Sequence, residues 1–120
     1  MSKKQDIRAH FRDAVFTRDR YTCRVCGRVW SAKDADPALG RIDAHHVLDR
    51  HLFPNGGYVM ENGITVCAEG EDSCHMKCEQ YHITGTSLPG LHPDDLYGMI
   101  GSSLDAAIAA DDRLNPDPHR

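Results

Sequence analysis

Two adjacent histidines, His45 and His46, follow Asp43 in a stretch with apolar residues on both sides. Apolar flanks of this kind predict a short β-strand, in which neighbouring side chains point to opposite faces. One imidazole can then bind a metal ion while the other faces a substrate or solvent. Paired histidines also occur on ordinary surface loops, so the prediction depends on the residues that bracket them.

Cysteines bracket the histidine pair on both sides. Cys23 and Cys26 are followed by Gly27, which is typical of a zinc knuckle: the tight turn lets two thiolates bind one ion, and glycine can take a positive φ. Cys67 and Cys74 follow the histidines, so four thiolates can form a closed, structural zinc site. Such an ion would stabilise a core as small as this one.

Three alternatives to this zinc site follow from the same residues. Cys78 can replace Cys74, although one helical turn further on it is better placed as a buried thiol. A thioredoxin-type redox pair expects a βαβ setting, which we do not find around Cys23. A disulfide-stapled secreted domain is disfavoured, because five cysteines do not pair evenly and no apolar N-terminal run resembles a signal peptide.

A second set of polar residues surrounds the histidine pair. Asn62 lies at a predicted turn, and His75 and Glu79, four residues apart, share one face of a predicted helix. If that helix presents His75 toward His45, the two imidazoles form an open metal site with positions for water and phosphate oxygens. His46, on the other strand face, can then act as a general base, because an imidazole has a pKa of about 6.5.

Short elements must position these residues. Ser2 and Gln5 fit a capping box, and the apolar spacing that follows predicts an amphipathic helix over residues 3–17. Further elements are expected in order along the chain: a strand over 64–66, a helix over 74–82, a helix from Pro93, and a helix over 104–110 capped by Ser102 or Ser103. The charged, proline-containing end, 111–120, is expected to be disordered.

Together these motifs resemble the HNH nuclease family, of the zinc-bound ββα-metal kind. The match covers about residues 10–82 and includes Cys-x-x-Cys, a hydrophobic strand with His-His, then Asn, then Cys and Cys-His. The loop between Cys67 and Cys74 is longer than the family's usual Cys-x-x-Cys. The stretch 48–58 resembles phage and prophage members.

The resemblance implies a role for each matched residue. His46 matches the general base that activates the attacking water, and His45 matches the metal ligand that precedes it. Asn62 matches the asparagine that braces the loop and so orients the base. His75 matches the final ligand of a catalytic divalent ion, Mg²⁺ or Mn²⁺, which stabilises charge on the phosphorane and the departing 3′ oxygen.

The expected fold is α+β: a small ββα-metal (His-Me finger) core with a four-cysteine zinc site, flanked by N- and C-terminal helices. At 120 residues the chain is long enough for one domain. We expect residues 1–84 to form the nuclease domain and 85–120 a C-terminal helical extension with a disordered tail. No stretch approaches membrane-spanning length, and reduced cysteines favour the cytoplasm of a bacterial or phage-infected cell.

Charge is distributed unevenly along the chain. The net charge is −4, yet residues 1–60 carry 11 Lys and Arg against 7 Asp and Glu, whereas residues 61–120 carry 3 against 11. A one-sided basic patch is expected of a protein that binds a phosphate backbone, although a solvated helix face explains it equally well. The residues expected to contact DNA are Arg18, Arg20, Arg50 and Lys77.

The sequence therefore predicts a metal-dependent DNA endonuclease or nickase that hydrolyses phosphodiester bonds. The alternative is a zinc-stabilised DNA-binding module without catalysis, which would need the cysteines but has no use for both histidines, Asn62 and His75. An RNA-directed or packaging-associated nuclease shares the chemistry and differs in its partners, which would include phage packaging or replication proteins. We find no array of base-reading side chains and expect weak sequence preference.

Overall fold

The stretch around the histidine pair forms a strand, β1 (Ile42–His46), which pairs antiparallel with β2 (Gly63–Cys67). These strands make the two-stranded sheet of the computed structural model, which describes residues 3–114 of the chain. The helices are α1 (Lys3–Arg18), α2 (Cys74–Thr84), α3 (Pro93–Met99) and α4 (Leu104–Asp112). The described residues therefore have the predicted α+β class.

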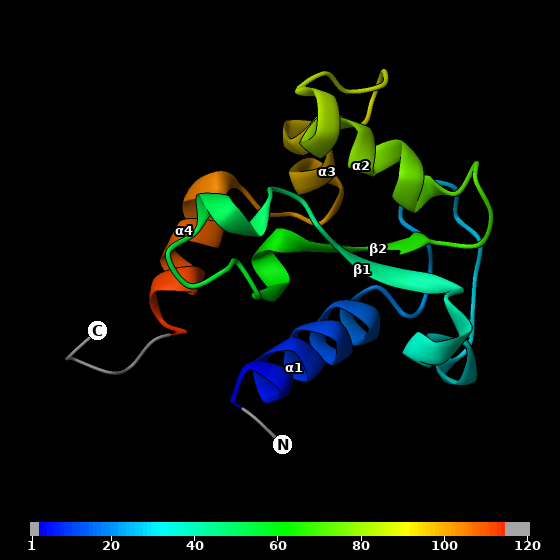
Figure 1. Ribbon diagram of the computed structural model, residues 1–120, viewed down its shortest axis with the longest axis horizontal. Helices are drawn as coiled ribbons and strands as arrows, with labels where there is room; N and C mark the ends of the chain where they lie inside the picture. The colour runs from blue at the N-terminus through cyan, green and yellow to red at the C-terminus, as the bar shows by residue number, and fades with distance from the viewer. Residues whose placement is uncertain (1–2, 115–120) are drawn as a thin grey trace.

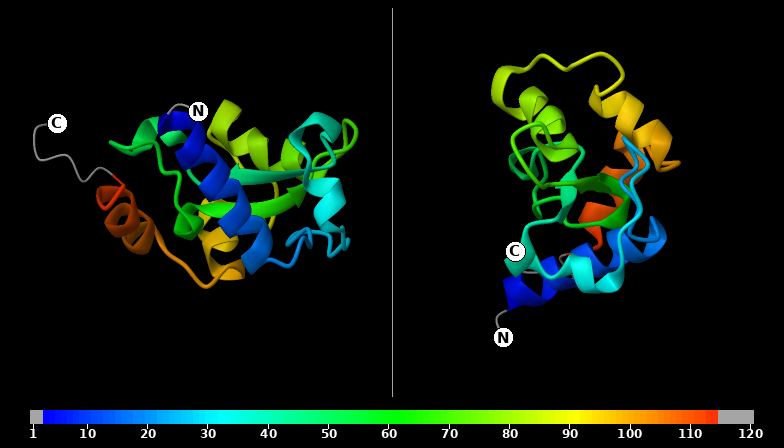
Figure 2. Two further views of the ribbon diagram at one scale, coloured as in Figure 1. Left: turned by 90° about the horizontal axis from the view of Figure 1, so that it is seen from below. Right: turned by 90° about the vertical axis from the view of Figure 1, so that its right-hand side faces the viewer.

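The sheet lies between helices on its two faces. Helix α1 crosses one face, and α2 and α3 lie over the other (Figures 1 and 2). On the α1 face, Phe11 and Val15 form a buried cluster with Ala44. On the opposite face, Ile64 and Val66 belong to a second buried cluster that includes residues of α2, α3 and α4. The buried apolar side chains of β1 therefore belong to the core on the α1 face, and those of β2 belong to the core on the opposite face.

The strand register determines which histidine meets which helix. His46 pairs with Gly63 and His45 with Ile64. The His46 ring lies 4.8 Å from that of Phe11 in α1, whereas the His45 ring lies 5.6 Å from that of His75 in α2. The two imidazoles therefore point to opposite faces of the sheet, as the sequence predicts.

The helices begin and end close to the predicted residues. Helix α1 continues one residue past the predicted 3–17, and the Ser2 half of the expected capping box lies outside the described residues. The hydroxyl of Ser103, one of the two predicted caps, accepts a hydrogen bond from Ala106 N at the start of α4. Within residues 3–114, no helix combines the length and apolar character needed to cross a membrane.

The prediction that the chain is disordered from Asp111 onward is wrong for the first of these residues. Helix α4 continues to Asp112, and Asp111 is fully buried. The sequence suggested disorder because the segment is charged, but Asp111 uses its charge inside the protein, as described below. Residues 115–120 lie outside the described part of the chain.

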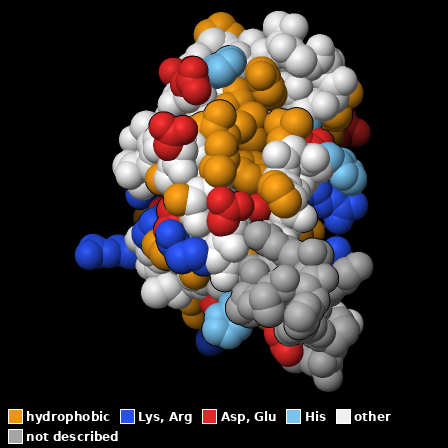
Figure 3. Space-filling view, turned by 90° about the vertical axis from the view of Figure 1, so that its left-hand side faces the viewer, with side chains coloured by type: hydrophobic (Ala, Val, Ile, Leu, Met, Phe, Trp, Pro, Cys, Tyr) orange, Lys and Arg blue, Asp and Glu red, His pale blue; other side chains and the backbone are white. Residues whose placement is uncertain are grey.

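The C-terminal helices contribute to the same core as β2. Leu91, Leu96, Tyr97 and Ala107 are buried in the cluster that contains Ile64. Figure 3 shows apolar side chains gathered on the side where α4 lies, and α4 itself carries partly exposed Leu104 and Ile108. The predicted division of the chain at residue 84 stays a prediction, and residues on both sides of it share one core cluster.

Gly63 provides a test of the close packing between α1 and the sheet. A Cβ at this position would lie 2.5 Å from Val15 Cγ2 and 2.6 Å from Phe11 Cε1, so Gly63→Ala should lower the free energy of unfolding by about 1–3 kcal/mol. Gly98→Ala is the matched control, because its Cβ would meet nothing within 4 Å and alanine favours a helix. Denaturant unfolding of both variants checks this; equal stability would contradict the packing.

Candidate functional site

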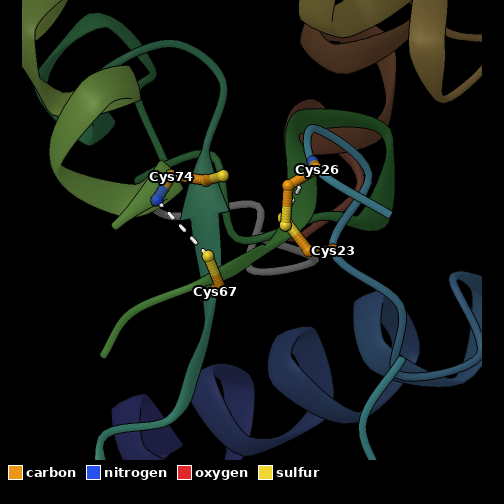
Figure 4. Close-up of side chains that lie close together, drawn as sticks. All are labelled: Cys23, Cys26, Cys67 and Cys74. Atoms are coloured by element: carbon orange, nitrogen blue, oxygen red, sulfur yellow. Dashed lines mark hydrogen bonds between the residues drawn. The ribbon is translucent and has the colours of Figure 1, made fainter. Parts of the chain in front are cut away.

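Four cysteines from three separate segments meet beside the sheet (Figure 4). The Sγ atoms of Cys23, Cys26, Cys67 and Cys74 all lie within 4.8 Å of one another. A tetrahedral zinc ion with bonds of about 2.3 Å would hold its sulfurs about 3.8 Å apart, so a small contraction brings them to ligand distance. The knuckle turn has the predicted shape, with φ of 83° at Gly27.

The polarity around these thiols suits a metal ion. Backbone N–H groups of Cys26 and Cys74 donate to the Sγ atoms of Cys23 and Cys67, each over 3.4 Å. Burial raises the pKa of Cys23, but hydrogen bonds with the backbone of Cys26, Cys67 and Val25 outweigh it and lower this pKa to about 7. Burial raises the pKa of Cys74, and hydrogen bonds with neighbouring thiols raise this pKa further. Four thiolates at this spacing need a cation, and the donor set fits zinc.

The fifth cysteine stays outside this group. Cys78 is 1 % exposed, one turn along α2 from Cys74, and its side chain belongs to the apolar core. Burial raises the pKa of its thiol to about 12. Of the two alternatives open from the sequence, the structure brings Cys74 into the four-cysteine group.

A second group of possible metal ligands lies between β1 and α2. His75 Nε2 lies 3.3 Å from Asp43 Oδ2 and 3.6 Å from Glu79 Oε1, and that oxygen is 3.5 Å from His45 Nδ1. These distances are longer than those of ordinary charged hydrogen bonds. They are close to the ~3.0–3.4 Å that separates neighbouring ligand atoms around an ion whose bonds are about 2.1 Å long. The structure thus brings the predicted ligands His45 and His75 together.

His82 joins this group, and the sequence analysis missed it. Its Nε2 lies 3.3 Å from His45 Nε2 and 2.9 Å from the His46 carbonyl oxygen, and His45, Glu79 and His82 can also hold an ion. The signal was present in the sequence: residues 75, 79 and 82 follow i, i+4, i+7 spacing on one helix face. The resemblance gives His75 as the final ligand and therefore assigns no role to His82.

His46 lies on the α1 side, in apolar surroundings. The rings of Phe11 and Tyr58 lie 4.8 and 4.7 Å from its ring. Burial, with the charge of His45, lowers its pKa to about 4, against an opposing hydrogen bond with the Gly56 backbone. Its Nε2 is buried and has no hydrogen-bond partner among the described residues. The imidazole is therefore held neutral, with one nitrogen available.

Asn62 is fully buried and fastens the loop between the strands. Its Oδ1 accepts from Leu48 N over 3.1 Å and from the Tyr97 hydroxyl over 2.7 Å. Its Nδ2 donates to the carbonyl oxygens of Leu48 and Gly57. An asparagine side chain can make about four such bonds, so this one is saturated. Its hydrogen bonds therefore tie Leu48 and Gly57 of the loop to Tyr97 of α3.

A cleft of about 440 Å³ is lined by both His45 and His46. His75 does not line this cleft. The basic side chains on its wall are Arg8, Arg12, Arg50 and His51. Of the predicted DNA contacts only Arg50 lines the cleft. Arg8 and Arg12, one helical turn apart on α1, belong to the basic first half of the chain but were not among the predicted DNA contacts. Periodicity alone does not show which part of a polar helix face borders a cleft.

The other predicted DNA contacts lie elsewhere. Arg18 donates to both carboxylate oxygens of buried Asp19 and to the carbonyl oxygens of Met60 and Gly63, so its guanidinium holds α1 to the chain entering β2. Arg20 and Lys77 are exposed and do not line the cleft. These three residues therefore do not contribute to the cleft surface.

Comparison of the chain with protein-family models, curated proteins and solved structures gives no match. The function must therefore be argued from the geometry of the two residue groups and the cleft.

The cysteine group predicts a difference between two buried thiols. Cys23→Ser removes one of four ligands and should lower the bound zinc from about one per chain to near zero, with a large fall in melting temperature. Cys78→Ser changes a thiol of equal burial outside the group and should keep its zinc. Elemental analysis and thermal unfolding check both; zinc retained by Cys23→Ser, or lost from Cys78→Ser, would contradict the assignment.

Proposed function

We propose that this protein is a metal-dependent DNA endonuclease or nickase of the HNH kind, with zinc held by its four cysteines. One observation carries the proposal. His45, among possible metal ligands, and His46, a neutral imidazole with an available nitrogen, leave one strand on opposite faces and line the same cleft. Hydrolysis of a phosphodiester with a metal ion and a base needs this combination.

The order of the elements supports the same proposal. Strands β1 and β2 and helix α2 follow one another in the chain, and the helix packs against the face that carries His45. A ββα-metal core has this strand–strand–helix order, as the resemblance implies. The longer loop between Cys67 and Cys74 still brings both thiols into one group.

The ligands around His45 fit a hard or borderline divalent ion. Imidazole nitrogens and carboxylate oxygens suit Mg²⁺, Mn²⁺ or zinc, and Mg²⁺ or Mn²⁺ fits a site that keeps water and phosphate oxygens as further ligands. Such an ion, when bound, supplies charge stabilisation for the phosphorus centre and the departing oxygen. Burial lowers the pKa of His45, which keeps this imidazole in the neutral form that ligation requires.

His46 provides the base. Its Nε2, which has no hydrogen-bond partner among the described residues, takes a proton from a water molecule as the oxygen of that water bonds to phosphorus. The bond between phosphorus and the departing oxygen then breaks. The rings of Phe11 and Tyr58 limit the orientations of the imidazole. Asn62 acts indirectly, since its hydrogen bonds set the loop that carries Gly56.

Arginines on the cleft wall can hold the DNA strand. Arg8 lies over the Tyr58 ring at 5.5 Å and Arg50 donates to the Tyr58 hydroxyl over 3.4 Å, so both guanidinium groups lie near the His46 ring. Guanidinium groups bind phosphate oxygens in pairs of hydrogen bonds. Contacts of this kind position a strand without reading bases, which agrees with weak sequence preference.

A supercoiled-plasmid assay tests the proposal. The wild type should convert supercoiled DNA to nicked circles with Mg²⁺ or Mn²⁺ and not with chelator. His46→Ala should lower the rate at least about 10²-fold, as expected for loss of a general base. His10→Ala is a matched control, because His10 is an exposed histidine of α1 that does not line the cleft with His46.

The controls separate the outcomes of this assay. His46→Ala must keep its zinc and its melting temperature, so that a lost rate reports lost chemistry. Equal nicking by His46→Ala would exclude His46 as the base. A zinc-loaded wild type that binds DNA and never cuts it would favour the zinc-stabilised binding module instead.

The lowered pKa of His46 predicts an unusual pH profile. Only neutral imidazole can accept the proton, and a histidine of ordinary pKa, about 6.5, would lose about three-quarters of its neutral form at pH 6. With a pKa of about 4, His46 stays neutral at pH 6, so cleavage at saturating ion should fall little between pH 7 and pH 6. Rates measured across pH 5–8 check this; a fall of about fourfold with a midpoint near 6.5 would contradict the buried base.

A further inference from the structure

The C-terminal helix α4 contacts the loop that holds His46. Asp111 is fully buried, and its two carboxylate oxygens accept hydrogen bonds from Asn55 N over 3.1 Å and Gly57 N over 2.8 Å. The Asn55 side chain donates in return to the Asp111 carbonyl oxygen over 2.9 Å. These contacts join residues 54 to 56 positions apart in the sequence, so α4 fastens a loop that is remote in the chain.

The segment that Asp111 holds, residues 55–57, leads directly into Tyr58, whose ring lies 4.7 Å from the His46 ring. The Gly56 backbone also opposes the lowering of the His46 pKa. Gly56 and Gly57 have φ values of 88° and 66°, in the left-handed region. A Cβ at Gly57 would lie 2.7 Å from the Phe53 ring and 2.9 Å from Asn62 Nδ2. Two consecutive glycines have many other conformations open to them, so this one must be fixed by contacts from outside the segment.

Helix α3 supports the same loop from a second direction. The Tyr97 hydroxyl donates to Asn62 Oδ1 over 2.7 Å in the buried core. The amide nitrogen of that asparagine donates to the Gly57 carbonyl oxygen. Gly57 is therefore held through its N–H by α4 and through its carbonyl by an asparagine that α3 supports.

The chemistry of Asp111 agrees with a role at this loop. Burying a carboxylate is costly unless its charge is compensated, and among the described side chains Asp111 takes part in no salt bridge. Two loop N–H groups compensate it instead. The two N–H groups contact different oxygens of Asp111, and in asparagine one of these oxygens is replaced by an NH2 donor that cannot accept a hydrogen bond.

We propose that Asp111 and Tyr97 are positioning residues for His46, so that helices α3 and α4 are part of the catalytic unit. The proposal rests on the proposed function, in which His46 is the base. Neither residue lines the cleft. Both act through the loop, and their loss should lower the rate of the chemical step more than it weakens DNA binding.

Asp111→Asn tests the proposal, with Asp112→Asn as the matched control. The control makes the same change of charge one residue further on, at an exposed position. Asp111→Asn should speed amide hydrogen exchange at Gly57 and change the ring ¹⁵N shifts of His46, which report its tautomer. Its single-turnover cleavage rate should fall about 10- to 100-fold, with DNA affinity in chelator unchanged within about twofold. Asp112→Asn should match the wild type in Gly57 hydrogen exchange, His46 ring shifts, cleavage rate and DNA affinity.

Tyr97→Phe is the second variant, because it keeps the buried ring and removes only the hydroxyl. Its rate should fall about fivefold, as expected for one lost hydrogen bond, and the His46 shifts should change in the same direction. Both variants are measured well below their melting temperatures, with bound zinc confirmed. Unchanged His46 shifts and Gly57 exchange in both variants would overturn the proposal, as would a fall in rate shared by Asp112→Asn.

The proposed function and this inference can fail separately. Exchange and ring shifts require no cleavage, so they test the positioning of His46 even in a wild type that does not cut DNA. If the wild type cuts DNA and both variants cut at its rate, the nuclease stands and the positioning role is overturned.

Discussion

Alternation along a single strand is the constraint on which the rest of this structure depends. Because neighbouring side chains of β1 point to opposite faces, His45 meets α2 and His46 meets α1, although the two residues are adjacent in the chain. A shift of one residue in the pairing with β2 would exchange their surroundings and remove the glycine that faces His46. The positions of the proposed metal ligands and of the proposed base, and the packing of α1, all follow from one register.

A two-stranded sheet is marginal by itself, and here it is stabilised from several directions. The four cysteines connect the knuckle, the end of β2 and the start of α2, so one ion would join three segments that meet the sheet. Buried Asp19 ties α1 to β2, since its carboxylate accepts from Thr65 N over 3.0 Å. Helices α3 and α4 close the second core and reach the loop beside His46. The contacts that stabilise the two-stranded sheet therefore also determine the geometry of the cleft.

Local patterns predicted much of this arrangement. The Cys-x-x-Cys-Gly turn, the strand with His45 and His46, and the start of α2 depend on neighbouring residues, and the structure has them at the predicted positions. The sequence could not show that Arg18 points inward, because its acceptors lie more than 40 residues away. Asp111 was misjudged for the same reason: its partners, Asn55 and Gly57, come from a distant loop. Composition describes a segment, whereas long-range hydrogen bonds decide whether a charge is buried.

The central claim is that the chain holds two different ions, one among sulfurs and one at His45. Anomalous diffraction from crystals of the zinc-loaded protein soaked in Mn²⁺, recorded above and below the zinc absorption edge, tests it most directly. We expect a zinc peak between Cys23, Cys26, Cys67 and Cys74, and a separate manganese peak beside His45 with ligands from α2. A zinc peak at the sulfurs with no manganese at His45 would contradict a second, catalytic ion. The absence of a zinc peak among the four sulfurs would contradict the structural site.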